Sequence, residues 1–274
     1  MKIVLTDELK EEVVKYYLSK PMTMEDVRVY CGLSRPTIAK ILNEYNVNRY
    51  TKAKIFNPDL NEDYFEIIDT PNKAYFLGLI IADGNVFEVD DSSNRQSSIS
   101  ITLKECDKYI LEKFKEEVCL NTSVSFDGRG CCYIAIRSNK MAQDLRRYGI
   151  HPRKTFDSIL PNIQNELIPH LLRGLFDGDG CIQAHQTDVN NRYKHSVGWC
   201  GTKQLMEQIR DWLVENLNVT NISVYSYKTR SLSMVTWANI DDIQTICKCL
   251  YDNANIYLLR KHNLYNEFVQ HYNL

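Results

Sequence analysis

Two aspartates stand at the ends of two similar apolar segments, and a pair of acids of this kind can hold a divalent cation. Residues 75–84 read Tyr-Phe-Leu-Gly-Leu-Ile-Ile-Ala-Asp-Gly, and residues 171–180 read Leu-Leu-Arg-Gly-Leu-Phe-Asp-Gly-Asp-Gly. Asp83 and Asp179 hold the same place in the two segments, 96 residues apart. A repeat at this spacing indicates two copies of one small domain.

Both segments have the composition of a buried helix, and in each of them small residues recur four positions apart. They are Gly78 and Ala82 in the first segment and Gly174 and Gly178 in the second. Positions four apart share one helix face, so each helix would present a smooth strip to a second backbone. The pattern predicts a close, pseudo-twofold helix pair with the two aspartates side by side at one end.

The aspartates would lie at helix C-termini, where the helix dipole disfavours negative charge, and they would also repel each other. A bound cation removes this cost, and oxygen-only ligands suit Mg²⁺, Mn²⁺ or Ca²⁺. The sequence therefore predicts a metal site at Asp83, Asp179, Ala82 and Gly178, with Mg²⁺ as cofactor and Mn²⁺ or Ca²⁺ as substitutes for binding. Metal ions held by paired acids can promote phosphodiester hydrolysis by stabilising the attacking and leaving oxygens. The glycines after the two acids, Gly84 and Gly180, are expected to end the helices in the left-handed conformation.

Residues 76–84 and 172–180 resemble the two signature helices of the LAGLIDADG homing endonucleases in their single-chain form. The resemblance extends over roughly residues 72–274 and implies an α+β fold of two αββαββα subdomains. It also implies saddle-shaped antiparallel sheets that grip the major groove, and metal-dependent cleavage of both strands with Asp83 and Asp179 as the catalytic acids. The first segment departs from the signature at Ile81, where the second segment has Asp177.

An Arg-Lys pair follows the last predicted helix of each half, at Arg153-Lys154 and at Arg260-Lys261. The resemblance implies that Lys154 and Lys261 approach the active site as catalytic residues. A cation there could polarise the phosphate, relay protons through water or steady the leaving oxygen. Contact with the DNA backbone is the alternative role for these pairs.

Alternating apolar and polar residues predict strands between the helices of each half. Such a sheet buries one face under helices and leaves a polar face free for DNA, where Arg and Lys suit guanine, Gln suits adenine, and any of them can reach phosphate. The candidates for DNA contact outside the N-terminal region are Gln96, Ser98, Ser100, Thr102, Arg137, Arg153, Gln183, His185, Lys194, Tyr227, Lys228, Arg230 and Arg260.

The N-terminal region has the pattern of a helix-turn-helix module. Helices are predicted over residues 7–18 and 24–30, and Ser34 can cap a third helix that runs to about residue 45. Six basic residues and one acid, Glu44, lie between positions 28 and 54. The module is expected to bind DNA through a basic face, and its candidate contacts are Arg35, Thr37, Lys40, Arg49 and Lys52.

The composition is that of a globular protein, with 44% hydrophobic and 25% charged residues and a net charge of −2. We predict a helix-turn-helix domain over residues 1–54, a linker over 55–71, and LAGLIDADG subdomains over 72–158 and 159–274. Apolar runs of the length of a membrane span are absent from the sequence. The nine cysteines match neither a zinc pattern nor a disulfide framework, so reduced thiols are expected.

The predicted function is metal-dependent, site-specific cleavage of double-stranded DNA by a monomer with internal pseudo-twofold symmetry. A cytoplasmic location is expected: the cytosol or nucleoid of a bacterial or phage-infected cell, or an organelle. Two alternatives are a non-cleaving transcriptional regulator on the same scaffold and an RNA-binding, maturase-like protein. Clustered carboxylates argue against the regulator, and the N-terminal module favours duplex DNA over RNA.

Overall fold

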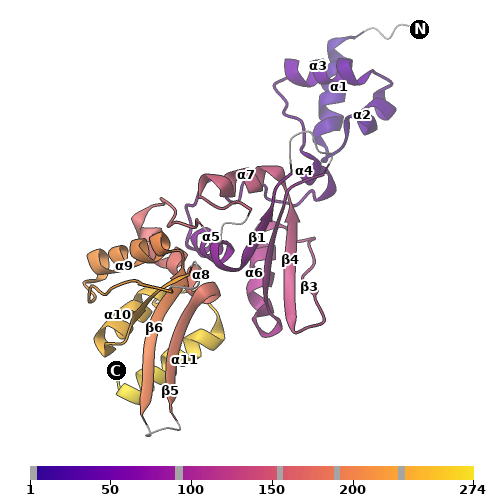
Figure 1. Ribbon diagram of the computed structural model, residues 1–274. Helices are drawn as coiled ribbons and strands as arrows, with labels where there is room; N and C mark the ends of the chain where they lie inside the picture. The colour runs from indigo at the N-terminus through magenta and orange to yellow at the C-terminus, as the bar shows by residue number, and fades with distance from the viewer. Residues whose placement is uncertain (1–4, 90–94, 153–156, 188–191, 228–231) are drawn as a thin grey trace. The chain divides into compact units, whose positions relative to one another are not determined.

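The computed structural model of the chain describes residues 5–89, 95–152, 157–187, 192–227 and 232–274 (Figure 1). The chain divides into two units, one comprising Met1–Glu62 with Val118–Asn121 and the other comprising Asp63–Glu117 with Thr122–Leu274. In the described ranges, no helix has both the length and the apolar composition needed to cross a lipid bilayer.

Side-chain caps start each helix described in the N-terminal unit. The helices are α1 (Asp7–Leu18), α2 (Met24–Cys31), α3 (Arg35–Glu44) and α4 (Lys52–Phe56). The caps, whose hydroxyls accept a hydrogen bond from the first turn, are Thr6, Thr23, Ser34 and Thr51. Thr23 and Asp26 form the predicted capping box.

The turn between α2 and α3 depends on Gly32, whose φ of 69° lies in the left-handed region that glycine adopts without strain. Ser34 then begins α3, and Ile38, Ile41 and Leu42 point into the core of the unit, as predicted. The remaining buried residues of this core are Val13, Tyr17, Met22, Val27 and Leu33. The helices and turn therefore occupy the positions that the sequence indicates.

Residues 55–71, for which the sequence predicts a linker, contribute several buried side chains. Tyr64 and Phe65 are buried, and the Tyr64 hydroxyl donates to a Glu117 carboxylate oxygen at 2.5 Å. The Tyr64 ring also meets Phe114 edge to face, with 6.1 Å between ring centroids. These aromatic residues therefore pack against α6 (Lys108–Val118).

The second unit contains the same order of elements twice. In the first half the order is α5 (Pro71–Asp83), β1 (Gly84–Phe87), β2 (Ser98–Lys104), η1 (Glu105–Asp107), α6, β3 (Ser125–Phe126), β4 (Cys131–Arg137) and α7 (Asn139–Arg147). In the second half it is η3 (Asn165–Leu167), α8 (Ile168–Asp179), β5 (Gly180–Gln186), β6 (Tyr193–Gly201), α9 (Lys203–Leu217), β7 (Tyr225–Ser226), β8 (Ser233–Trp237) and α10 (Ile240–Tyr251). The predicted αββαββα succession is confirmed in both halves.

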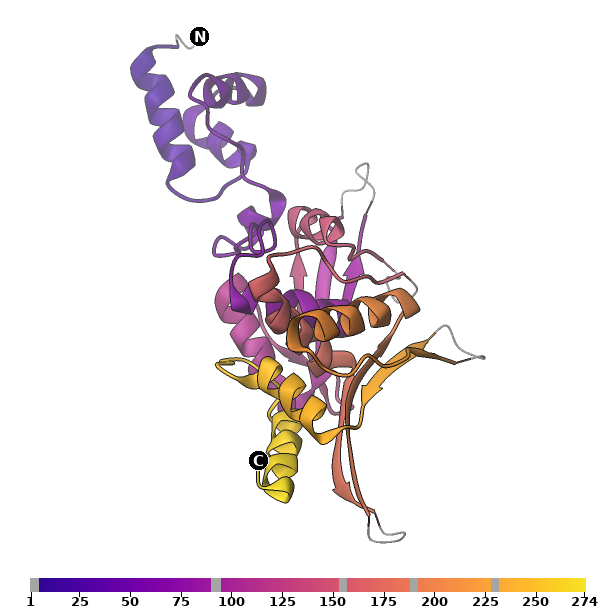
Figure 2. The same ribbon diagram turned by 90° about the vertical axis from the view of Figure 1, so that its left-hand side faces the viewer.

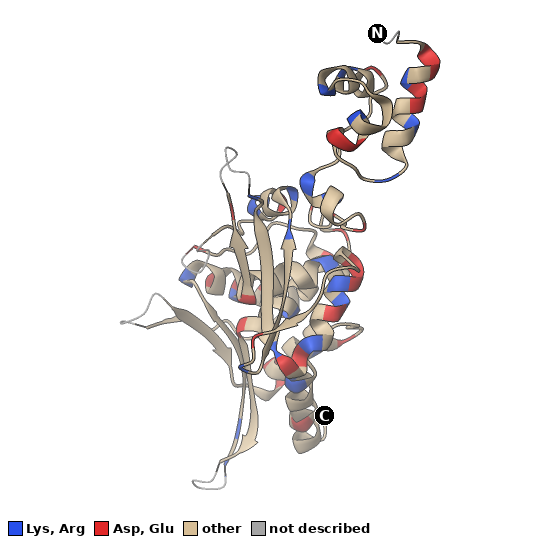
Figure 3. Ribbon diagram, turned by 90° about the vertical axis from the view of Figure 1, so that its right-hand side faces the viewer, with Lys and Arg blue, Asp and Glu red and all other residues tan. Residues whose placement is uncertain are grey.

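Each half has one antiparallel sheet, with strand orders β1-β2-β4-β3 and β5-β6-β8-β7. Alternate residues of β2 and β4 are buried, such as Ile99 opposite Ile136 and Ile101 opposite Ile134. Their neighbours point to the other face, because successive side chains of a strand alternate. Figures 1 and 2 show helices on one side of the strands in each half, and Figure 3 shows that the strands carry few charged residues.

The glycines of the repeated segments bring α5 and α8 into direct backbone contact. A Cβ atom on Gly78 would lie 2.9 Å from Leu175 N and would overlap the Leu171 carbonyl oxygen. A Cβ on Gly174 would lie 2.8 Å from Leu79 N and would overlap the Tyr75 carbonyl oxygen. The seam between the helices is therefore pseudo-symmetric, and glycine is required on both sides.

Gly84 and Gly180 do not adopt the predicted left-handed conformation. Their φ values are −83° and −77°, because each is already the first residue of a strand. Glycine is required there for space instead. A Cβ on Gly84 would lie 2.6 Å from the Ile80 carbonyl oxygen, and one on Gly180 would lie 2.7 Å from the Phe176 Cα.

A further helix that the sequence did not predict, α11 (Leu259–Tyr272), follows α10. It packs beside β5 and α10 and buries Lys261, Tyr265 and Phe268. The Arg260-Lys261 pair therefore lies in the first turn of a helix. This placement fixes the direction of both side chains.

Candidate active site at the end of the helix seam

Asp83 and Asp179 are the last residues of α5 and α8, and both are exposed at the same end of the seam. Gly178, the residue before Asp179, lies next to the Asp83 carboxylate. A Cβ on Gly178 would lie 3.2 Å from Asp83 Oδ2 and 3.4 Å from its Cγ, and would overlap the Cβ of Ala82. The carboxylate of the first half therefore lies against the turn of the second half that carries Asp179, as the sequence predicts.

A cavity of about 150 Å³ opens beside Asp179. Its lining includes Ile81 and Ala82 from α5, and Cys200 from the end of β6. The Cys200 thiol donates to the Asp179 backbone oxygen at 3.3 Å, and burial raises the pKa of this thiol. The cavity therefore joins residues of both halves next to one of the two acids.

Lys261, in the first turn of α11, reaches the same end of the seam and is only 5% exposed. Its ammonium donates to the backbone oxygens of Gly180, at 2.6 Å, of Gly178, at 3.4 Å, and of Phe176. Burial lowers the pKa of Lys261 to about 8, although the nearby Asp177 and Asp83 carboxylates oppose this shift. The lysine thus binds three backbone oxygens around the C-terminal end of α8, among them the Phe176 oxygen, which also accepts from Gly180 N.

Asp177 connects the seam to the start of α11. Its Oδ2 accepts hydrogen bonds from the Tyr75 hydroxyl and from Leu258 N, each at 2.8 Å. Burial raises its pKa to about 6, even though these hydrogen bonds and the nearby Lys261 favour the charged form. Because Tyr75 belongs to α5, this one carboxyl group holds α5, α8 and α11 together.

Arg173, one turn before Asp177 on α8, is also fully buried. It donates to the backbone oxygens of Ile256 and Leu250, at 2.8 and 2.9 Å. Its guanidinium carbon lies 5.5 Å from the centroid of the Tyr75 ring, a cation–π contact. The segment between α10 and α11 is therefore fixed to the middle of the seam.

The start of α11 is also attached to the first half. Arg260 donates from Nε to Asp107 at 2.9 Å, and the Tyr109 hydroxyl accepts a hydrogen bond from Leu259 N at 2.6 Å. The same hydroxyl donates to the Tyr257 backbone oxygen at 2.8 Å. Arg260, a predicted DNA contact, is thus engaged in an ion pair between the halves.

Replacing Lys261 with Met is expected to destabilise the second unit by about 3 kcal/mol, because buried carbonyl groups lose a charged donor. Urea unfolding followed by tryptophan fluorescence measures this, since all three tryptophans (Trp199, Trp212 and Trp237) belong to this unit. Lys203→Met is the matched control. Lys203 is 66% exposed and lies 3.6 Å from Glu207, so its loss should change stability by less than about 0.5 kcal/mol. Equal stability of Lys261→Met and wild type would show that the lysine does not support the α8 terminus.

The strand candidates for DNA contact share the uncovered faces of the two sheets. In the first half Ser98 pairs with Arg137, and in the second His185 pairs with Lys194. The strand register adds candidates that the sequence does not predict, because alternation of residue types alone does not define the strand ends. These residues of the same faces are Asn85, Phe87, Tyr133, Ser196 and Thr236.

The remaining strand-side candidates have different positions. Ser100, Thr102 and Gln183 share the uncovered faces. Gln96 precedes β2 and is half-buried, and Tyr227 is exposed after β7. Four other candidates, Arg153, Lys154, Lys228 and Arg230, lie outside the described residues.

The candidates of the N-terminal unit lie on or after α3. Arg35 is the first residue of α3, and the Thr37 hydroxyl lies 2.8 Å from the Ser34 hydroxyl at the helix cap. Lys40 points outward from α3, and Arg49 is exposed in the segment that follows. Lys52, also exposed, begins α4.

A scan against protein-family models and a search of curated proteins found no match to the chain. Solved structures do match it. The LAGLIDADG meganuclease I-AabMI bound to uncleaved DNA is 14% identical with a TM-score of 0.51, over 73% of this chain and 89% of that one. I-SmaMI bound to an uncleaved DNA target in the presence of calcium ions is 13% identical with a TM-score of 0.53, over 75% and 92% of the two chains.

A third structure, the LAGLIDADG homing endonuclease I-GzeII in complex with its DNA target, is 15% identical with a TM-score of 0.53. The match covers 72% of this chain and 88% of that one, so it extends beyond either half alone. The chain therefore has the fold of the LAGLIDADG homing endonucleases. The fold that the two repeated segments predict is confirmed.

Proposed function

We propose that the chain is a site-specific endonuclease that cuts both strands of a DNA duplex at the end of the helix seam. One observation carries the proposal. Each half contributes one carboxylate, Asp83 or Asp179, at the end of the paired helices α5 and α8, and the Asp83 carboxylate lies against the turn that carries Asp179. Because one chain contains both halves, a monomer is sufficient to act on both strands.

The residues at this end of the seam fit a hard divalent cation such as Mg²⁺. Asp83 and Asp179 are both exposed at the ends of their helices, and the Asp83 carboxylate lies against the turn of α8 that carries Asp179, where a Cβ on Gly178 would be 3.2 Å from Asp83 Oδ2. Asp83 and Asp179 would hold the ion through their carboxylates, and the neighbouring Ala82 and Gly178 offer backbone oxygens. Two carboxylates are enough for Mg²⁺, which keeps several of its waters. The ion supplies Lewis-acid stabilisation of the negative charge that develops on the phosphate.

The chain's own residues position these groups. Lys261 fixes the C-terminal turn of α8 by holding its carbonyl oxygens, and thereby sets the direction of Asp179. Asp177 fixes α5 against α8 through Tyr75. We therefore assign Lys261 a positioning role, because its ammonium already binds backbone oxygens at the place where the sequence predicts a catalytic cation.

DNA would lie along the uncovered faces of the two sheets. These faces carry hydroxyl, amide and basic groups at alternating positions of the strands, and such groups can bind base edges and phosphates. The solved structures of similar fold, I-AabMI and I-GzeII among them, are complexes with DNA. The sheets and the exposed cations of the N-terminal unit would together define a long recognition site.

Incubating the protein with a randomised duplex library, with Mg²⁺ or with a chelator, tests this proposal. We expect both strands of a small set of sequences to be cut in Mg²⁺ only. Binding of selected duplexes without any cutting would favour a transcriptional regulator instead. Failure to bind duplexes, together with binding to structured RNA, would favour a maturase-like protein.

The N-terminal unit should contribute to affinity through phosphate contacts. Replacing Lys40 with Gln removes one outward cation of α3, and we expect the slope of log K against log salt concentration to fall by roughly 0.9. Lys15→Gln removes another exposed cation, on α1, and should leave the slope nearly unchanged. Fluorescence anisotropy on the selected duplex at several salt concentrations measures both. The same slope for Lys40→Gln and wild type would remove α3 from the DNA interface.

A further inference from the structure

Glu25, in the first turn of α2, holds two arginines at the entrance to α3. Its Oε1 accepts hydrogen bonds from Arg28, with Nε at 2.8 Å and Nη2 at 2.5 Å. Its Oε2 accepts from Arg35, with Nε at 2.9 Å and Nη2 at 2.5 Å. These bonds lower the pKa of Glu25 to about 2, so the carboxylate stays charged at neutral pH.

The ion pair leaves the far edge of the Arg35 guanidinium available. Glu25 binds the side edge, formed by Nε and Nη2, and in the described part of the chain no hydrogen bond engages Nη1 of Arg35. The arginine side chain remains 62% exposed. A guanidinium can bind a carboxylate by one edge and present its terminal amines to a second acceptor pair, because its donors form a rigid planar fork.

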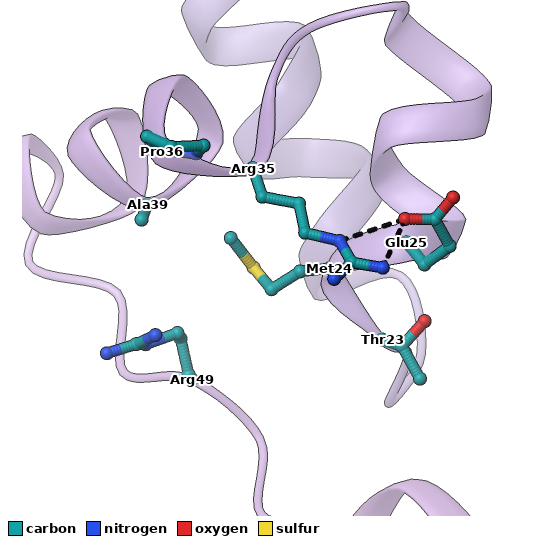
Figure 4. A pocket seen from close by; sticks show the side chains of 7 residues that line it. All are labelled: Thr23, Met24, Glu25, Arg35, Pro36, Ala39 and Arg49. Atoms are coloured by element: carbon teal, nitrogen blue, oxygen red, sulfur yellow. Dashed lines mark hydrogen bonds and ion pairs between the residues drawn. The ribbon is translucent and has the colours of Figure 1, made fainter.

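A groove of about 490 Å³ lies directly beside this arginine (Figure 4). Arg35 and Arg49 lie on two sides of it, and Met24, Pro36 and Ala39 provide an apolar lining between them. The side chains of Pro36 and Ala39 are small, so they protrude little from this part of α3. The groove thus offers space beside Arg35 for a base-pair edge, and Arg49 supplies a positive charge at its other side that suits the phosphate backbone.

We propose that Glu25 is a positioning residue that presents Arg35 to the O6 and N7 atoms of one guanine in the major groove. The groove receives the edge of that base pair. The inference rests on the proposed function in so far as the N-terminal unit binds duplex DNA, but it does not require cleavage. It assigns a base preference to a place outside the helix seam and the sheets.

A surface carboxylate repels DNA phosphates, so Glu25 has a cost for binding in general. That cost is offset only at a DNA site to which an ordered Arg35 side chain binds more tightly than a mobile one. The alternative is that Glu25 merely competes with phosphate for Arg35. The two roles predict opposite effects of removing the charge: loss of discrimination in the first case, and a uniform gain of affinity in the second.

The test selects bound duplexes from a randomised library with the full chain in chelator, and measures the affinity for the selected site. We expect wild type to prefer one guanine by about 10-fold or more over adenine, and to lose this preference when 7-deazaguanine removes the N7 acceptor. Glu25→Gln should reduce the preference to under about 3-fold. Arg35→Lys should do the same, because lysine cannot bind both acceptors in the plane of the base.

Two matched variants separate positioning from charge. Glu11→Gln removes an exposed acid of α1 and should keep the preference. Arg28→Gln leaves the Glu25–Arg35 pair in place and should also keep it. Thermal unfolding of each variant checks that the unit remains folded.

An unchanged guanine preference in Glu25→Gln, or equally increased affinity for every duplex, would overturn the proposal. The proposal would also be overturned if the duplexes selected by wild type showed no guanine preference that is lost in Arg35→Lys. Absence of cleavage in Mg²⁺ would refute the endonuclease but would leave a preference that depends on Glu25 standing. The two failures are therefore distinguishable.

Discussion

Replacing Asp179 with Asn is expected to lower the rate of cleavage of both DNA strands by roughly 10³-fold, equivalent to about 4 kcal/mol in the activation barrier, while binding stays within about 3-fold of wild type. Asn keeps the size of the side chain but removes the negative charge that would hold the proposed cation. Asp83→Asn should have the same effect, because its carboxylate lies against the same turn of α8. Gel-based strand cleavage and anisotropy on one selected duplex measure the two quantities separately.

The control for this pair is Asp211→Asn. Asp211 lies on α9, is 55% exposed and pairs with Arg210, so the variant should cut at the wild-type rate. Normal cutting by both seam variants would remove the two acids from the mechanism. A loss of cutting that merely follows a loss of binding would assign them to DNA contact rather than to chemistry.

Gly174→Ala should have the largest effect on stability. The added Cβ would overlap the Tyr75 carbonyl oxygen and lie 2.8 Å from Leu79 N, and these are backbone atoms of the opposite helix that no rotamer change can move. The helices must separate, which we expect to lower the free energy of unfolding by at least about 3 kcal/mol. Urea unfolding with tryptophan fluorescence reports on this unit alone.

Gly201→Ala, in the same unit, is the matched control. Its Cβ would meet the terminal methyl of Met206 at 3.2 Å, and this flexible side chain can turn away. We expect a change of less than about 1 kcal/mol. Equal effects of the two substitutions would mean that the helix seam tolerates a methyl group and is looser than its geometry indicates.

The repeated segments predicted the most important features of the fold from sequence. Gly78 and Gly174 stand in register with the two aspartates, and a small residue facing a second backbone has few explanations other than close helix packing. The helices of the N-terminal unit were equally well marked, because Thr23, Ser34 and Gly32 are local signals that act within one turn. Such signals act between residues close in the sequence, so they do not depend on the tertiary structure.

Features that depend on distant residues were missed. The helix α11 begins at Leu259, and its N-cap residue Leu258 makes no side-chain capping bond. The carboxylate that accepts from Leu258 N–H belongs to Asp177, on α8. The first buried residue of α11 is a lysine, Lys261, so the helical spacing of its buried residues cannot be recognised from apolar residues alone. The burial of Lys261 against backbone oxygens at the end of α8 could not be predicted either, because it depends on the packing of α11 beside β5. Pairing between strands likewise decided which residues of β1, β6 and β8 face outward.

The most direct test of the central claim is to locate the metal. Crystals of the protein with its selected duplex, soaked in Mn²⁺, should give anomalous scattering peaks within about 2.5 Å of the carboxylates of both Asp83 and Asp179. The same peaks should disappear in the Asp83→Asn, Asp179→Asn double variant with DNA still bound. Mn²⁺ held by other residues, or DNA cut in a crystal without metal at these two aspartates, would contradict the account.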